Sequence, residues 1–285
     1  MNVQIIDNIS QNMASILSSA IRESEDVRVA VAFISQSGLD AIRSSLETNL
    51  RAGGHIEFLV GLDMYITEPR ALRTIYDLSH KNTNVAVYCH ASFSPETIYH
   101  PKLYLFRTSD RVTSIIGSSN LTIGGLKKNV EVNVLIQASA QDGIVSDAYD
   151  TYNQLKFHQH RVVPDEEFLV LYEQVYESRK EQQRRTRRHK SSGRLVETLK
   201  EKVDSMQRPI PTHRDLVGWL GMVYAFLPDG EFTNQEVYAH ESVFQQRYPD
   251  NRNIKAKIRQ QLQLLRDLGF IEHLDQARWR KLRKA

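Results

Sequence analysis

The stretch Tyr99–Ile136 decides the fold: YHPKLYLFRTSDRVTSIIGSSNLTIGGLKKNVEVNVLI. It holds an apolar run around Leu103, a second at Val112–Ile116 and a third at Glu131–Ile136. Apolar runs of this length, separated by polar turns, predict three successive strands. Side chains that can do chemistry stand where these strands begin or end, namely His100, Lys102, Asn120 and Glu131. We therefore expect the chemical site within this stretch.

His100 and Lys102 are two residues apart at the start of the first strand. Because side chains alternate between the faces of a strand, residues i and i+2 project from the same face. We therefore expect an imidazole and an ammonium side by side. The sequence GSSN at 117–120 is small and polar, which suits a close approach of backbone to a phosphate. Together with the amide of Asn120 and the carboxylate of Glu131, these groups predict phosphoryl transfer without a metal.

The order of these residues resembles the signature of the phospholipase D superfamily. The pattern is His-x-Lys, then Gly-Ser-x-Asn after the next strand, then Asn-x-Glu at the third. It is most similar to the metal-independent restriction endonucleases of the BfiI and NgoFVII type. The family often has an Asp five residues after the Lys, a place held here by Arg107. The nuclease branch relies on His, Lys, Asn and Glu instead. The resemblance implies a layered α/β sandwich that hydrolyses phosphodiesters without a cofactor.

The resemblance also implies a mechanism. His100 attacks phosphorus to give a phosphohistidine, and a second His100 protonates the leaving oxygen. Lys102 and Asn120 hold the phosphate oxygens, Glu131 orients an imidazole, and Ser118 adds a hydrogen bond. Each chain has one such motif, whereas the mechanism uses two histidines. We therefore expect a homodimer whose active site is shared across the two-fold axis.

The segments that precede this stretch alternate between strand and helix patterns. Val27–Phe33, Ile56–Leu62 and Val85–Tyr88 are apolar runs of strand length. The alternation predicts an α/β domain with a mainly parallel sheet and a site at strand ends. We interpret His158 and His160 as surface histidines rather than metal ligands, because no acidic or Cys partner is near in sequence. The expected helices are Gln11–Glu23, Ser37–Leu50, Glu68–Ser79 and Gly143–His160.

Composition limits the classes of protein to consider. The 285 residues, 41% hydrophobic and 25% charged, are typical of a globular protein with room for two domains. The only cysteine, Cys89, excludes an internal disulfide and a Cys-based zinc site, and we expect it buried. No apolar run reaches the ~18 residues of a membrane span, and the N-terminus lacks the order of a signal peptide. We expect a cytoplasmic protein without a membrane partner.

Positive charge is concentrated in two zones. Arg179–Arg194 has eight Lys or Arg residues and one acidic residue, and Arg247–Ala285 has eleven Lys or Arg residues and four acidic residues. The net charge of the whole chain is only +3. Such zones indicate contact with a polyanion, and the alternative is a solvated helix face. We divide the chain into a nuclease domain at 1–163, a helical basic connector at 164–208 and a DNA-binding domain at 209–285.

The last domain has the element order of a winged helix. Leu216–Leu227 predicts a helix, and Thr233 with Glu236 forms a capping box that begins a second helix through Phe244. A third helix, Ile254–Leu268, precedes two wing strands at 270–274 and 278–282, in which Trp279 is expected in the core. Lys and Arg contact phosphates, and Arg and Gln can read base edges. The expected DNA-binding residues are Arg252, Asn253, Lys255, Lys257, Arg259, Gln260, Gln263, Arg278 and Arg280.

The amino-acid sequence of this domain resembles that of the winged helix of DpnI-type restriction enzymes. The similarity runs through Phe232-Thr, the Tyr-Pro-Asp-Asn turn and NIKAKIRQQLQLLRDLG at 253–269. It implies recognition of N6-methyladenine in a GATC context in double-stranded DNA. Our leading hypothesis is therefore a modification-dependent restriction endonuclease. The alternatives are an endonuclease without methyl dependence, a DNA-binding regulator with an inactive nuclease fold and, least favoured, a lipid phosphodiesterase.

Overall fold

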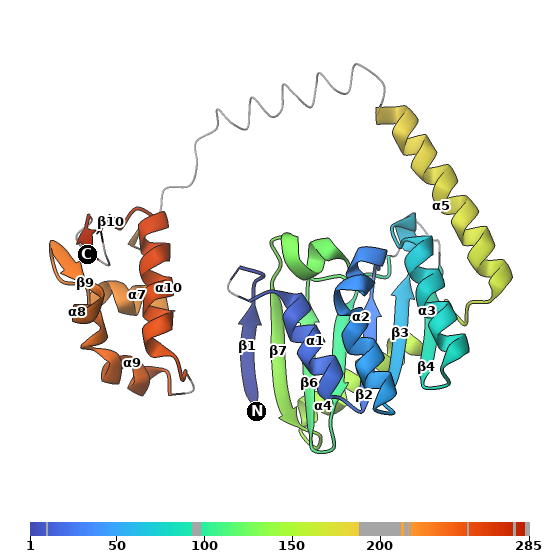
Figure 1. Ribbon diagram of the computed structural model, residues 1–285, viewed down its shortest axis with the longest axis horizontal. Helices are drawn as coiled ribbons and strands as arrows, with labels where there is room; N and C mark the ends of the chain where they lie inside the picture. Colours follow the sequence, from blue (N-terminus) through green and yellow to red (C-terminus); the bar gives the residue numbers. More distant parts are fainter. Residues whose placement is uncertain are drawn as a thin grey trace. The chain divides into compact units, whose positions relative to one another are not determined.

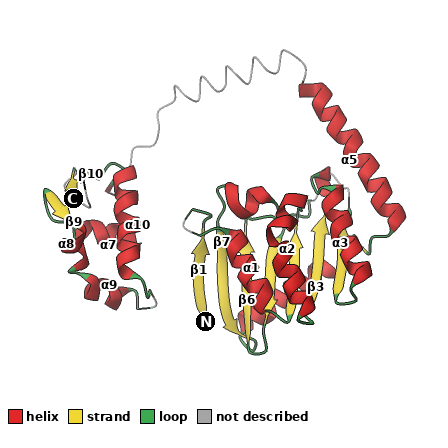
Figure 2. Cartoon of the chain, in the orientation of Figure 1, coloured by secondary structure: helices red, strands yellow, loops and turns green. Residues whose placement is uncertain are grey.

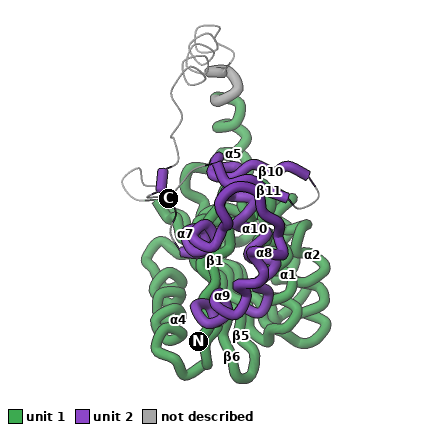
Figure 3. The backbone as a smooth tube through the Cα atoms, turned by 90° about the vertical axis from the view of Figure 1, so that its left-hand side faces the viewer, with its two compact units in different colours: residues 1–194 green, residues 195–285 purple. Residues whose placement is uncertain are grey.

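In the computed structural model of the chain, the described residues are 1–9, 11–92, 98–187, 212–213, 216, 218–249, 251–275 and 278–282. They fall into two compact units, Met1–Arg194 and Leu195–Ala285 (Figure 3). The first unit is a layered α/β domain and the second is mainly helical with a small sheet (Figure 2). The predicted fold class, an α/β sandwich followed by a winged helix, is confirmed.

The first unit is built on an eight-stranded sheet in the order β1-β7-β6-β5-β2-β3-β4-β8. Only β2-β3 and β3-β4 are parallel pairs, and the other five neighbours are antiparallel. The expectation of a mainly parallel sheet is therefore wrong. The strands are β1 (Asn2–Ile6), β2 (Asp26–Val31), β3 (His55–Gly61), β4 (Val85–His90), β5 (Lys102–Arg107), β6 (Arg111–Gly117), β7 (Asn133–Ser139) and β8 (Arg161–Val162).

The physical reason lies in the connections. Helices join β2 to β3 and β3 to β4, and such crossovers return the chain in the same direction. Three residues separate β5 from β6, so that this pair is a hairpin and must be antiparallel. Residues 118–132 join β6 to β7 and include the π-helical turn η2 (Gly124–Lys128), and the chain reverses its direction across them. The strands β1 and β8 were not predicted, and both lie at the edges of the sheet.

Helices cover both faces of this sheet (Figure 1). The helices α1 (Met13–Glu23), α2 (Gln36–Arg51) and α3 (Pro69–Lys81) lie side by side on one face, and α4 (Gly143–Lys156) lies on the other. Side-chain caps fix where the first two begin. Asn12 Oδ1 accepts the Ser15 N–H at 3.0 Å, and the Ser35 hydroxyl accepts the Gly38 N–H at 3.1 Å. The predicted helix Gly143–His160 ends at Lys156.

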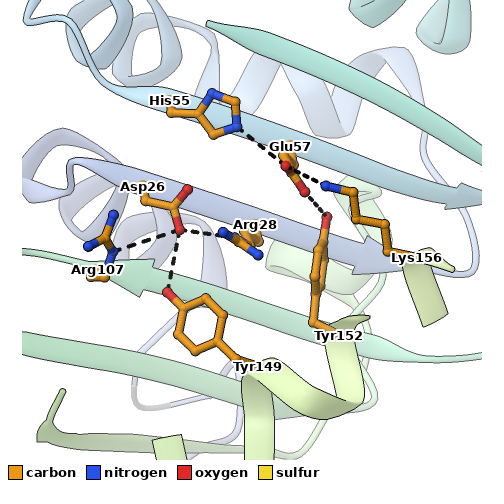
Figure 4. Close-up of polar contacts among 8 residues, drawn as sticks. All are labelled: Asp26, Arg28, His55, Glu57, Arg107, Tyr149, Tyr152 and Lys156. Carbon is orange, nitrogen blue, oxygen red and sulfur yellow. Dashed lines mark hydrogen bonds and ion pairs between the residues drawn. The ribbon is translucent and has the colours of Figure 1, made fainter. Parts of the chain in front are cut away.

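A charged network lies between α4 and the sheet (Figure 4). Buried Glu57 on β3 accepts hydrogen bonds from Lys156 Nζ at 2.8 Å and from the Tyr152 hydroxyl at 3.1 Å. Buried Asp26 on β2 accepts from Arg28 at 3.0 Å and from the Tyr149 hydroxyl at 3.4 Å. Each buried carboxylate therefore has both a cation and a phenol as partners, which offsets the cost of removing it from water.

The helix α5 (Glu166–Arg187) begins against the first unit. Its Leu169 and Tyr172 are buried in the core that α3 shares, and the Tyr172 hydroxyl donates to the Thr67 carbonyl oxygen at 2.9 Å. The end of α5 overlaps the basic zone Arg179–Arg194, and residues 188–208 of the proposed connector lie outside the described residues. The division at 1–163, 164–208 and 209–285 stays a prediction.

The second unit has the helices and strands of a winged helix. Its elements are α7 (Gly218–Ala225), β9 (Glu231–Thr233), α8 (Asn234–Tyr238), α9 (Glu241–Arg247), α10 (Ile254–Asp267), β10 (Ile271–Asp275) and β11 (Arg278–Lys281). The predicted capping box is present at Thr233 and Glu236. The single helix expected through Phe244 is divided into α8 and α9, and β9 adds a third strand beside β11. Trp279 is buried, as predicted, and its Nε1 donates to Asn234 Oδ1 at 2.8 Å.

Candidate active site

The sheet brings the chemical residues to one edge. Lys102, the first residue of β5, lies opposite Val31, the last residue of β2. Gly117 ends β6 opposite Asn133, where β7 begins. The carboxyl ends of β2, β3, β4 and β6 and the amino ends of β5 and β7 therefore share this edge. The antiparallel strands that the sequence analysis did not foresee still place the polar residues together.

His100 and Lys102 stand side by side, as the i, i+2 spacing predicts. Lys102 Nζ lies 2.7 Å from Nδ1 and 3.0 Å from Nε2 of His100, and it donates to the His100 carbonyl oxygen at 2.9 Å. Phe33 packs edge-on against the imidazole with ring centroids 5.5 Å apart. Burial and then the charge of Lys102 lower the pKa of His100. The neutral imidazole, which has a lone pair for nucleophilic attack, is therefore favoured.

Lys102 is itself unusual, because its side chain is only 6% exposed. Burial lowers the pKa of its ammonium, and the charge of Glu131 opposes that shift. An ammonium with a reduced hydration shell interacts more strongly with an anion than one in open water. Lys102 is thus suited to hold a phosphate oxygen next to His100.

The loop after β6 is held by hydrogen bonds to three other residues. The Ser119 carbonyl oxygen accepts a hydrogen bond from the Tyr104 hydroxyl at 2.8 Å, and the Ser119 N–H donates to Asn133 Oδ1 at 3.1 Å. The Leu121 carbonyl oxygen accepts the Ser35 N–H at 3.1 Å. Gly125 allows the turn to close on the loop, since a Cβ there would lie 2.5 Å from the Asn120 carbonyl oxygen. The loop is consequently preorganised rather than adaptable.

Within this loop the amide of Asn120 has a fixed orientation. Its Oδ1 accepts the Phe33 N–H at 3.1 Å. No partner of its Nδ2 is found in the part of the chain that the structure describes. The amide is therefore able to donate from Nδ2 to a phosphate oxygen.

Glu131 and Ser118 form a separate pair at the same edge. The Ser118 hydroxyl donates to Glu131 Oε2, and the same hydroxyl accepts the Val132 N–H at 3.0 Å. Asn129 Nδ2 donates to Glu131 Oε1 at 3.2 Å. The carboxylate acts on Lys102 through its charge, and within the part of the chain that the structure describes it makes no hydrogen bond to His100. The predicted role of Glu131, orienting an imidazole, stays a prediction.

Two family models match separate parts of the chain. Residues 15–155 match the family described as "Cardiolipin synthase, PLD-like domain". Residues 217–281 match the family described as "Dam-replacing HTH domain". The chain joins a phospholipase D-like domain to a Dam-replacing-type helix-turn-helix domain. All five predicted catalytic residues fall within the first match.

Solved structures give fold similarities at low identity. NucT from Helicobacter pylori is 16% identical over 57% of this chain and 99% of its own, with a TM-score of 0.45. Nuc from Salmonella typhimurium, a phospholipase D family member, is 20% identical over 54% of this chain and 95% of its own, with a TM-score of 0.40. Phosphatidylserine synthase from Haemophilus influenzae is 13% identical over 57% of this chain and 40% of its own, with a TM-score of 0.46.

Arg107 holds the place at which the phospholipase D pattern often has an Asp. It ends β5, whereas Lys102 begins it, so that five residues of strand put their Cα atoms roughly 16 Å apart. Arg107 Nε lies 4.0 Å from Asp26 Oδ2, its neighbour across the strand pair (Figure 4). The departure thus adds a cation to the charged network of the phospholipase D-like domain and leaves the edge with His100 unchanged.

Several residues at the site of the phospholipase D-like domain escaped the sequence analysis. Tyr99 and His90 stack with ring centroids 4.6 Å apart, and Asp63 accepts the Tyr99 N–H at 2.8 Å. His158 and His160, interpreted above as ordinary surface histidines, lie 5.2 Å and 5.8 Å from His90 between ring centroids. No sequence signal joins these positions, because the contacts link β3, β4 and the turn after α4. Among the described residues, no three His, Cys, Asp or Glu side chains are arranged to hold a metal ion.

In the helix-turn-helix domain, α10 turns most of its predicted DNA-binding residues outward. Lys255, Arg259 and Gln263 are exposed, and so are Arg252 and Asn253 just before the helix, whereas Lys257 and Gln260 are half-buried. Several already have partners within the protein, since Lys255 pairs with Glu241 and Arg259 donates to the Tyr238 hydroxyl at 3.2 Å. Exposed pairs of this kind contribute little to stability, so their breakage on binding an anion costs little.

The two wing arginines are both matched by carboxylates, whereas Arg259 on α10 donates to a hydroxyl group. Arg278 pairs with Asp275 at 2.8 Å, and Arg280 pairs with Glu231 at 2.7 Å and with Glu272 at 3.4 Å. The wing of the helix-turn-helix domain therefore presents less positive charge than its sequence suggests. Its role in contacting DNA stays a prediction.

Proposed function

We propose that this protein is a DNA endonuclease in which His100 is the nucleophile. The observation that carries the proposal is the contact between His100, whose lowered pKa favours the neutral imidazole, and the buried ammonium of Lys102. Asn120 lies at the same edge of the sheet. This arrangement lies in a phospholipase D-like domain that is joined to a helix-turn-helix domain of the Dam-replacing type. The second domain favours DNA as the source of the phosphodiester.

In the proposed reaction, a nitrogen of His100 attacks phosphorus, the P–N bond forms and the P–O bond to the leaving strand breaks. Lys102 Nζ and Asn120 Nδ2 donate to the non-bridging oxygens. A second imidazole gives its proton to the leaving oxygen and then takes one from the water that hydrolyses the phosphohistidine. Ser118 fixes the carboxylate of Glu131, which orients one of the imidazoles. The second imidazole is the partner's His100, so that the active enzyme is a homodimer.

We further propose that the winged helix selects adenine-methylated DNA in a GATC-like context. The support is the match of residues 217–281 to a Dam-replacing domain, together with outward Arg259 and Gln263 on α10. Arg and Gln are side chains that read purine edges in the major groove. The protein would then act as a modification-dependent restriction endonuclease.

One digest tests these proposals. Plasmid from an adenine-methylating host and from a non-methylating host is incubated with the protein in the presence of EDTA. We expect cleavage of the methylated plasmid alone. Cleavage of both plasmids would refute the methyl dependence and retain the nuclease. Cleavage of neither plasmid, with binding retained, would favour a DNA-binding regulator, and release of a headgroup from phospholipid vesicles would favour a lipid phosphodiesterase.

A further inference from the structure

A buried carboxylate accepts a hydrogen bond from the residue that precedes the proposed nucleophile. Asp63 begins the short turn η1 (Asp63–Tyr65) after β3, and it is 2% exposed. Its Oδ2 accepts the backbone N–H of Tyr99 at 2.8 Å, and its Oδ1 accepts the Ser92 hydroxyl at 3.3 Å. A carboxylate so deeply buried is costly unless it is hydrogen-bonded. Its bond to Tyr99 acts one residue before His100.

The ring of Tyr99 is fixed as firmly as its backbone. Tyr99 is 6% exposed and stacks on His90 with an interplanar angle of 17°. It also lies over Gly61, where a Cβ would come within 2.7 Å of Tyr99 Cδ1. On the other side of His100, the Pro101 carbonyl oxygen accepts the Ala32 N–H at 3.0 Å. The backbone is therefore held immediately before and immediately after the imidazole.

The turn that carries Asp63 is strained. Met64 and Tyr65, which follow it, have φ angles of 61° and 54°, and neither is a glycine. Left-handed backbone is disfavoured for residues that carry a Cβ atom. Strain of this kind persists only where the surrounding contacts determine the conformation, and it is concentrated at functional sites.

We propose that Asp63 is a positioning residue that sets the place of His100 by accepting the N–H of Tyr99. The inference rests on the proposed role of His100 as nucleophile. A reacting nitrogen must lie about 3–3.5 Å from phosphorus and in line with the leaving oxygen, and a displacement of about 1 Å costs on the order of 100-fold in rate. Asp63 Oδ2 also lies 3.6 Å from His90 Nδ1, and its hydrogen bond to the Tyr99 N–H reaches His100 through the backbone.

Two substitutions separate the hydrogen bond from the charge. Asp63→Ala removes the acceptor, whereas Asp63→Asn keeps an oxygen that accepts the Tyr99 N–H. We expect Asp63→Ala to lower kcat for DNA cleavage by about 100-fold with an unchanged KM, and Asp63→Asn to retain most of the activity. Ile75→Ala, on the buried face of α3, controls for lower stability because it removes core volume and leaves the Tyr99 N–H acceptor in place. A loss of kcat in Ile75→Ala as large as that in Asp63→Ala would overturn the proposal, and so would equal losses in the two Asp63 variants.

A second readout needs no DNA. Nitrogen-15 NMR of the His100 ring reports its tautomer and its titration midpoint. In the wild type we expect one dominant tautomer and a midpoint below the ordinary value of about 6.5. In Asp63→Ala we expect mixed tautomers and a midpoint that has moved up toward that value, with Asp63→Asn unchanged. If the wild type cleaves no DNA, the proposed function fails while this titration still decides the inference. An unaltered His100 titration in folded Asp63→Ala would overturn it.

Discussion

The surroundings of His100 favour its neutral form, since burial and the neighbouring Lys102 both lower its pKa. Replacement by alanine removes the proposed nucleophile and leaves α10 untouched. We expect His100→Ala to reduce cleavage by at least about 1,000-fold while DNA binding stays unchanged. Cleavage assays and gel shifts on the same preparation check this, with His80→Ala, an exposed histidine on α3, as the control. Loss of binding in a folded His100→Ala protein would contradict separate reading and cutting domains.

The charge of Lys102 has a measurable effect on its neighbour. Because a nearby ammonium disfavours the imidazolium, Lys102→Gln is expected to raise the pKa of His100. In the wild type, the lowered pKa keeps the imidazole of His100 neutral to a lower pH. The rate of cleavage should therefore fall on acidification only below about pH 6.5. NMR titration of His100 in the two proteins checks the first expectation. Lys127→Gln, an exposed lysine beyond the site, should leave the midpoint unchanged.

Among single residues, the pair His100 and Lys102 could be predicted because strand alternation is a local rule. Asn120 was also expected at this edge, but no pattern in the sequence indicates that Phe33 orients its amide. Asp63 stayed hidden for a physical reason. Its partner Tyr99 is 36 positions away in the chain, and the bond joins a side chain to a backbone group, which leaves no pattern in residue types.

The charged network between α4 and the sheet should make the stability of the first unit depend on pH. Burial raises the pKa of Glu57, but the hydrogen bond and charge of Lys156 lower it, and the net pKa is below its usual value. A carboxyl group whose pKa is lowered by folding stabilises the folded state above its unfolded pKa of about 4.3, and this contribution disappears as the pH falls through the folded pKa.

We therefore expect Lys156→Met to lower the free energy of unfolding by about 3 kcal/mol at pH 7, since it leaves Glu57 with one partner fewer. The difference from wild type should shrink below about pH 4, where the carboxyl group is protonated. Urea unfolding at both pH values measures it. Lys81→Met at the exposed end of α3 is the matched control. A difference that is the same at both pH values would show that lost packing, rather than the ion pair, is responsible.

The helix α10 carries the proposed reading function. Arg259 is exposed and is of a type that makes bidentate contacts to a purine edge. We expect Arg259→Ala to reduce discrimination between methylated GATC and unrelated DNA by about 1–3 kcal/mol. Lys257→Ala should weaken binding to all DNA sequences equally, and it should lower the slope of log binding constant against log salt concentration by about 1. Binding isotherms at several salt concentrations separate these outcomes. Arg266→Ala, at the far end of the same helix, should change neither quantity.

The starts of helices could be predicted from the sequence better than the directions and the edge strands of the sheet. Capping residues are local signals, and the box at Thr233 and Glu236 was predicted as it stands. Strand direction is not local, because an apolar run reads the same in either direction. The edge strand β1 was missed since four of its five residues are exposed and it has no buried alternation to reveal it.

For the whole molecule, the central prediction is the oligomeric state. A mechanism that uses two histidines needs two chains, because each chain has one His-x-Lys motif. We expect sedimentation equilibrium to give a dimer. Mixed dimers of wild type with His100→Ala should be inactive, so that excess variant suppresses the wild-type activity. A strictly monomeric protein with full activity would contradict the shared site.

The pairing of β1 with β7 has a consequence for how the protein is made. Asn2 and Gln137, which face each other across that pair, are 135 residues apart in the chain. In the same way, β2 must wait for β5. Contacts over such separations give a high contact order, which slows folding. On the ribosome, the edge that holds His100 and Lys102 therefore stays open until β7 has emerged, so the newly synthesised chain has no assembled cutting site for most of the synthesis of this domain.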